Sequence, residues 1–203
     1  MRHRKLLRSP RLRGSVDVDF AVELGDDDET LDFPWAAPEG GPRYFDLKGQ
    51  PELLTSIEEA KSVPELGEFL RVINSPSSIL ETAKCDAWST SDLNSEDEIF
   101  GLPIKFGSYV DLLFSRVEPR YSFERHEQIA KQLTQLLRRV PDIPATAEFL
   151  VRRCFYHEES NIREGLYITF YLFGFGDEIA QARQQWAVGL NLVQNAILQI
   201  SKL

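Results

Sequence analysis

The stretches SYVDLLFS (108–115) and LYITFYLF (166–173) decide the fold of this 203-residue chain. Each is typical of a β-strand, because every second residue is apolar and would lie on the same side of the strand. Aromatic and β-branched residues are also frequent in both stretches. Each runs into a helical pattern: FERHEQIAKQLTQLLRRV (123–140) follows the first strand, and DEIAQARQQWAVGLNLVQNAILQI (177–200) follows the second. Tyr109 and Tyr167 mark an offset of 58 residues between the two units.

A further strand-like stretch precedes each unit: ETAKCDAWS (81–89) before the first and AEFLVRRCFYH (147–157) before the second. The order strand, strand, helix therefore occurs twice. We predict an α+β fold, a two-layer sandwich in which a duplicated strand-strand-helix (ββαββα) unit forms a four-stranded antiparallel sheet with both helices on one side. Ser122 and Asp177 have side chains suited to capping the two helices at their N-termini.

The first 78 residues have a different character. Residues 1–14 carry six basic side chains and no acid, and eight acids follow between Asp17 and Asp32. So much charge with so little apolar surface predicts that residues 1–40 form a disordered charged tail. We predict that residues 41–78 form a strap and a helical hairpin whose helices begin at Pro51 and Pro64. Residues 79–203 are expected to form the duplicated unit, in a single globular body with 41–78.

The composition of the chain excludes several functional classes. The formal net charge is −9 at pH 7, and an acidic surface repels the phosphate backbone that supplies most non-specific nucleic-acid affinity. The longest apolar run is about ten residues, which is half of what a membrane helix needs. The basic first segment lacks the apolar stretch of a secretory signal. We therefore expect a cytoplasmic protein that binds neither nucleic acid nor a membrane.

Residues and motifs of common catalytic chemistry are few. The three histidines, His3, His126 and His157, lack the second histidine of a zinc-protease helix. Cys85 and Cys154 have no CxxC partner and are expected to be two reduced thiols. The chain contains no P-loop, GxGxxG or GxSxG motif. The sequence predicts neither a metal site nor a cofactor.

Strand alternation places an unusual set of side chains on the sheet face opposite the helices. These candidate site residues are Lys84, Asp86, Trp88, Tyr109, Asp111, Arg152, Tyr167, Tyr171 and Phe173. Tyrosine, tryptophan and arginine are enriched where proteins bind one another. Three arrangements are open: two copies pair as a homodimer, with ion pairs among the four charged residues; the sheet curves around a small molecule; or the N-terminal helices close over the face.

The function that this pattern favours is non-catalytic. We expect a binding or interaction protein that uses the open face for self-association or for a protein or small-molecule ligand. The alternative is a small enzyme with a pocket of carboxylates and tyrosines on the same face. Asp86 and Asp111 are its candidate catalytic residues, because burial beside Tyr109 would raise a carboxyl pKa toward that of a general acid. Tyr109 and Arg152 would complete this pocket, whereas an ion pair of the carboxylates with Lys84 or Arg152 is the competing, purely structural explanation.

Overall fold

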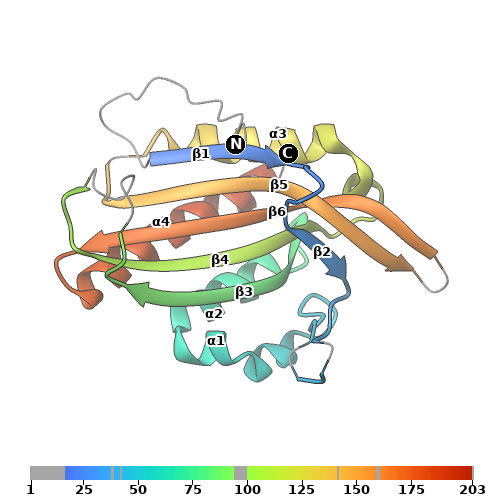
Figure 1. Cartoon of the computed structure of the whole chain (residues 1–203), viewed down its shortest axis with the longest axis horizontal. Helices are drawn as coiled ribbons and strands as arrows, with labels where there is room; N and C mark the ends of the chain where they lie inside the picture. Colours follow the sequence, from blue (N-terminus) through green and yellow to red (C-terminus); the bar gives the residue numbers. More distant parts are fainter. Residues whose placement is uncertain are drawn as a thin grey trace.

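The structure, a computed structural model, describes residues 17–37, 39–41, 43–93, 100–140, 142–158 and 161–202. Within these residues six strands form one mixed sheet in the order β1-β5-β6-β4-β3, and β2 also pairs with β5. The strands are β1 (Asp17–Glu23), β2 (Thr30–Phe33), β3 (Leu80–Thr90), β4 (Ile104–Phe114), β5 (Ala145–Glu158) and β6 (Asn161–Gly176). Figure 1 shows the sheet in front, with the helices α2, α3 and α4 behind it.

The prediction of a four-stranded antiparallel sheet built from a duplicated ββαββα unit is wrong. Strands β1 and β2 both pair with β5 in parallel, which makes the sheet mixed and six-stranded. The helices are also not equivalent: α3 (Phe123–Leu137) packs against β1 and β5, whereas the longer α4 (Ile179–Ile200) packs mainly against β6 and β4. The physical reason is the added edge strand β1, which widens the sheet beneath α3 and, within the described residues, has no counterpart beyond β3.

The acidic segment is ordered from Asp17 onward, contrary to the predicted disorder of residues 1–40. Its sequence DVDFAVE alternates acids with apolar residues, and Val18 and Phe20 belong to the core between sheet and helices. The acids therefore point away from that core, and β5 supplies the hydrogen-bonding partner that the segment lacks by itself. Residues 1–16, with the predicted basic arm, lie outside the described residues.

The predicted N-terminal helical hairpin is also corrected. Three short pieces stand in its place: a 3-10 helix η1 (Pro51–Ser56), the five-residue helix α1 (Glu58–Ser62) and the ten-residue helix α2 (Pro64–Ile73). Pro51 and Pro64 do open helical pieces, as predicted. Only Val63 separates α1 from α2, however, and α1 buries none of its own residues. Such a short piece does not form one arm of a helical hairpin.

The ends of the two long helices are set by local chemistry. Ser122 caps α3, because its hydroxyl accepts a hydrogen bond from the backbone N–H of Arg125. Asp177 does not cap α4, which begins two residues later, at Ile179. Gly174 on β6 allows α4 to approach closely, since a Cβ there would collide with the backbone of Ala182 and Trp186. The helix therefore lies directly on the centre of the sheet.

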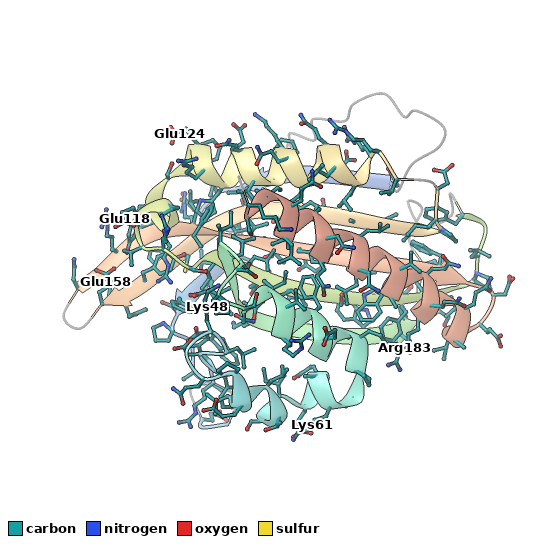
Figure 2. All side chains as sticks on the ribbon, turned by 180° about the vertical axis from the view of Figure 1, so that it is seen from behind. Lys48, Lys61, Glu118, Glu124, Glu158 and Arg183 are labelled. Carbon is teal, nitrogen blue, oxygen red and sulfur yellow. The ribbon has the colours of Figure 1, made fainter. Side chains whose placement is uncertain are left out.

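One hydrophobic core fills the space between the sheet and the helical layer. Val110, Leu112 and Phe114 of β4 and Ile168, Phe170 and Leu172 of β6 face this core, as the strand alternation predicts. Figure 2 shows α2, α3 and α4 side by side on this face. None of the described helices combines the length and the apolar character needed to cross a bilayer.

Candidate functional site

Strand pairing aligns the side chains of the opposite, open sheet face in rows that cross β1, β5, β6, β4 and β3. The first row contains Asp17, Thr146, Phe173, Gly107 and Trp88. The second row contains Asp19, Glu148, Tyr171, Tyr109 and Asp86, and the third contains Ala21, Leu150, Thr169 and Asp111. Six of the nine predicted site residues therefore meet within three adjacent rows, as strand alternation predicted.

Four half-buried rings form a continuous patch over the first two rows, and we call Trp88, Tyr109, Tyr171 and Phe173 the aromatic face. The Trp88 ring lies 6.0 Å from Phe173 and 6.5 Å from Tyr109, centroid to centroid, and Tyr171 lies 6.0 Å from Tyr109 and 6.4 Å from Phe173. Gly107 makes this patch possible, because a Cβ there would lie 2.7 Å from the Phe173 ring. The rings lie across the β4 backbone instead.

A polar network lies beside the aromatic face and is centred on Arg152, which is only 7% exposed. Its guanidinium group forms ion pairs with Glu23 at 2.8 Å and with Glu29 at 2.7 Å. It also donates a hydrogen bond of 3.2 Å to the Thr169 hydroxyl, which donates one of 2.8 Å to Asp111. Arg152 is thus linked to Asp111 through Thr169, and not by the predicted direct ion pair.

The two acidic partners of Arg152 come from the edge of the sheet. Glu23 ends β1 opposite Arg152, and Thr30 begins β2 opposite Arg153, so residues 24–29 form an excursion between two otherwise consecutive positions. Glu29 reaches back from this excursion to Arg152. Neither glutamate is identifiable as a site residue from the sequence, because the acidic composition of their segment predicts a disordered tail.

Asp111 is 4% exposed, and this burial raises the pKa of its carboxyl group to about 7, although the hydrogen bond from Thr169 opposes the shift. Asp86 is exposed, and its carboxylate accepts a hydrogen bond from the N–H of Ala87. The two carboxyl groups therefore differ in environment and lie in different rows. Burial also raises the pKa of the Cys85 thiol to about 12, so it is not a nucleophile at neutral pH.

The rest of the open face is covered by residues 30–37 and 43–47, which we call the strap. Its residues Leu31, Phe33, Trp35 and Tyr44 form a second, smaller core with Leu113, Cys154, Tyr156 and Tyr167. The Trp35 indole donates a hydrogen bond of 2.8 Å to the carbonyl of Ala83, and Lys84 lies 5.0 Å above the Trp35 ring. Tyr167 is consequently 1% exposed and does not belong to the aromatic face. The strap, and not the helical pieces, covers this half.

Arg120 is the central cation of the covered half. Its guanidinium carbon lies 5.5 Å from the Phe33 ring and 5.2 Å from the Tyr156 ring. The same group pairs with the carboxylate of Glu81 at 2.8 Å. Arg120 was not identified from the sequence because it lies outside the predicted strands. Glu81 was not identified because strict alternation from Asp86 places it on the helix side, whereas the register shift between Thr82 and Cys85 brings it opposite Leu113 on the open side.

Side chains form hydrogen bonds with backbone N–H and C=O groups at both edges of the sheet. Asn74 accepts a hydrogen bond from the N–H of Thr82, and Lys48 donates to the carbonyl of Leu80 on β3. On the other edge, Arg138 donates to the carbonyl of Val18 on β1. Proteins use such devices to prevent the addition of a foreign strand. The face of the sheet is therefore a better candidate for an interaction site than its edges.

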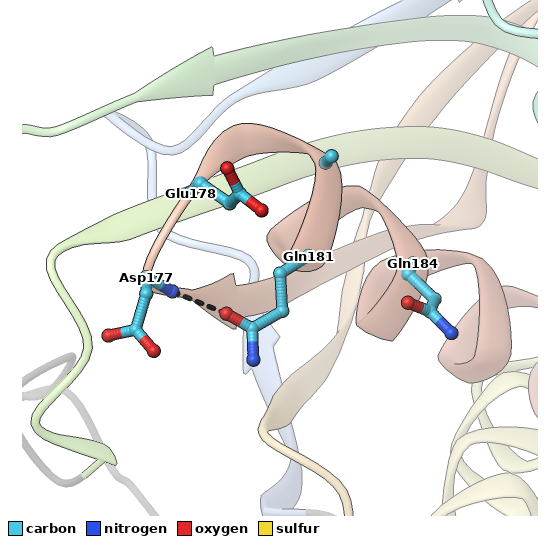
Figure 3. A pocket seen from close by; sticks show the side chains of 5 residues that line it. Asp177, Glu178, Gln181 and Gln184 are labelled. Atoms are coloured by element: carbon cyan, nitrogen blue, oxygen red, sulfur yellow. Dashed lines mark hydrogen bonds between the residues drawn. The ribbon is translucent and has the colours of Figure 1, made fainter.

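A shallow hollow lies at the start of α4. It is lined by Asp177, Glu178, Ala180, Gln181 and Gln184 (Figure 3). The side chain of Gln181 accepts a hydrogen bond of 2.7 Å from the N–H of Asp177. This contact occupies a donor at the helix start and leaves two carboxylates there, so the hollow is unsuited to an anion.

No known protein-family model, curated protein or solved structure matches this chain.

Proposed function

We propose that this chain is a non-catalytic interaction protein that binds another protein through its aromatic face. The observation that carries the proposal is the continuous patch of Trp88, Tyr109, Tyr171 and Phe173, all half-buried, on three adjacent strands. Aromatic rings held in a fixed, partly exposed cluster are typical of the anchors that dominate binding energy. A patch of this kind is also unfavourable in water if it stays uncovered.

The alternative of a small enzyme has weaker support. A general acid needs contact with its substrate, and Asp111 is only 4% exposed and accepts a hydrogen bond from Thr169, which is in turn bonded to Arg152. Asp86 is accessible, but it has no acid–base partner among the contacts of the described residues. The raised pKa of Asp111 is accounted for by its burial and needs no catalytic role.

A position-specific cross-linking experiment tests the proposal. A photo-crosslinking phenylalanine derivative replaces Tyr171 on the aromatic face, or Val188, which is 41% exposed on α4, as the matched control. In the native host we expect a discrete adduct from position 171, its loss when Trp88→Glu is added, and no such adduct from position 188. The proposal is wrong if both positions give the same adducts or if position 171 gives none.

The same experiment separates a foreign partner from self-association. An adduct of twice the mass of the chain, formed also by the purified protein, would show that a second copy occupies the face. That outcome would overturn the foreign partner and restore the homodimer that the sequence left open.

A further inference from the structure

We infer that the aromatic face binds an uncharged, proline-rich segment of its partner in the extended polyproline II conformation. This inference rests on the proposed function and specifies the chemistry of the partner. Polyproline II segments dock on surfaces of aromatic rings, to which they offer apolar proline rings and backbone carbonyl groups. Three features of the open face favour such a segment: the balance of its charges, the hydrogen-bond donors of its rings, and the strap that covers the adjoining half.

The charged side chains around the aromatic face already have partners within the chain. At the β1 edge, Asp19 pairs with Arg138 at 2.8 Å. Arg152 lies 5.8 Å from the centre of the Tyr171 ring and is held by its two glutamates. The other charged groups beside the rings also make contacts within the chain: Lys84, Lys105, Asp86 and Glu148. A charged partner would have to displace these contacts, whereas an uncharged segment leaves them intact.

The rings of the aromatic face have donor groups that suit the backbone of such a segment. Tyr109 and Tyr171 each have a hydroxyl group, and Trp88 has an indole N–H. The carbonyl groups of a polyproline II segment have no partners within the segment, so they can accept hydrogen bonds from these donors. The chain makes one contact of this kind itself, since the indole of Trp35 donates to the carbonyl of Ala83 at 2.8 Å.

The covered half of the same sheet face binds a segment of this kind from within the chain. The strap residues that follow β2, residues 34–37, have the sequence Pro-Trp-Ala-Ala, which contains a proline and no charge. Trp35 of this stretch packs on the small core of the covered half. On β6, Tyr167 of the covered half and Tyr171 of the aromatic face lie on the same side of the strand, with Thr169 between them. The aromatic face therefore continues the surface that the strap covers, and the partner segment would extend the strap layer.

The test uses the full chain and a capped decaproline peptide, which forms polyproline II by itself, with a Gly–Ser peptide of equal length as the control. The three tryptophans of the chain are replaced biosynthetically by fluorotryptophan, and each reports on a different region. Trp88 lies on the aromatic face, Trp35 in the strap and Trp186 in the main core. Substitution of each by Phe assigns its ¹⁹F resonance. An unchanged Trp186 resonance shows that a variant is folded.

We expect decaproline, titrated to about 5 mM, to shift the Trp88 resonance and to leave those of Trp35 and Trp186 in place. Tyr109→Phe with Tyr171→Phe should weaken binding by about threefold to tenfold, because two donors are lost while both rings remain. The control Val188→Ala, on α4, should change it by less than about twofold. Because no ion pair forms, raising NaCl from about 0.05 M to about 0.5 M should weaken binding by less than about twofold. The inference is overturned by an unshifted Trp88 resonance, an equal shift with the Gly–Ser peptide, or loss of binding at high salt.

The two proposals fail in different ways. If the cross-link from position 171 maps to a charged stretch of the partner that lacks proline, the aromatic face remains the interaction site and the proline-rich segment is wrong. If the cross-link is absent while decaproline still shifts the Trp88 resonance, the proposed function is wrong and the polyproline-binding chemistry remains.

Discussion

The open side of the sheet has two halves, one covered by the strap and one left uncovered. In the covered half Phe33, Tyr156 and Tyr167 are buried, and Arg120 lies against the first two rings while it pairs with the carboxylate of Glu81. In the uncovered half the aromatic face remains half-exposed beside Asp86 and Glu148. The same types of residue therefore serve internal packing in one place and are available for binding in the other. Substitutions should affect stability in the first half and binding in the second.

The largest stability effect is expected from Arg120→Met in the covered half. The variant leaves Glu81, with a side chain only 8% exposed, without its guanidinium partner. Removing one partner of a buried ion pair costs about 3–5 kcal/mol, so urea unfolding at pH 7 should show a loss of about 3 kcal/mol. Arg71→Met is the control, because Arg71 and Glu68 are both more than half exposed and the solvent screens such surface pairs, so this variant should unfold at nearly the wild-type urea concentration. Equal losses in the two variants would contradict the role given to Arg120.

Asp111, at the boundary between the halves, should make stability depend on pH. Burial raises the pKa of its carboxyl group to about 7, whereas an unfolded aspartate titrates near 3.9. Between these values the folded state holds one proton more, so its contribution to stability falls as pH rises, by on the order of 1 kcal/mol per pH unit. The contribution is fully present below pH 4 and lost above pH 7.

Asp111→Asn removes this titration and keeps an acceptor for the Thr169 hydroxyl. The variant should therefore gain stability relative to the wild type between pH 5 and pH 8, as measured by urea unfolding at each pH. Thr169→Val is a useful second variant, because it removes the link between Arg152 and Asp111 and leaves both charged groups in place. A constant difference between wild type and Asp111→Asn across this range would mean that Asp111 is already ionised in the folded state.

The sequence predicts the centre of the fold better than its edges. The alternation in β4 and β6 correctly divides the residues that face the helices, such as Val110 and Phe170, from those on the open face, such as Tyr109 and Tyr171. Strand β1 was missed although Val18 and Phe20 alternate with acids, because its charge density resembles that of a disordered segment. Its strand partner, β5, lies more than a hundred residues away in the sequence and leaves no local signal.

The sequence likewise predicts only the part of the site that depends on local strand alternation, and not the part that depends on long-range contacts. Alternation brings the four rings of the aromatic face to one surface, since it depends only on positions within each strand. It cannot show which rings the strap covers, because that depends on long-range contacts such as the hydrogen bond from Trp35 to Ala83. The partners of Arg152 also depend on the register of the interrupted edge strand, which places Glu23 and Glu29 on the same guanidinium group.

The smallest effects are expected from removing a single hydroxyl group in each half. Tyr156→Phe removes a buried hydrogen bond of 2.8 Å to the carbonyl of Leu166 and should cost about 1 kcal/mol of unfolding free energy. Tyr171→Phe should change stability by less than about 0.5 kcal/mol, because the hydroxyl of this half-exposed ring borders Arg152, and Arg152 keeps its ion pairs with Glu23 and Glu29 when the hydroxyl is removed. Thermal or urea unfolding of both variants gives the comparison. A loss at Tyr171 as large as that at Tyr156 would show that the aromatic face is built for the stability of the fold, and its role in binding would then lose its main support.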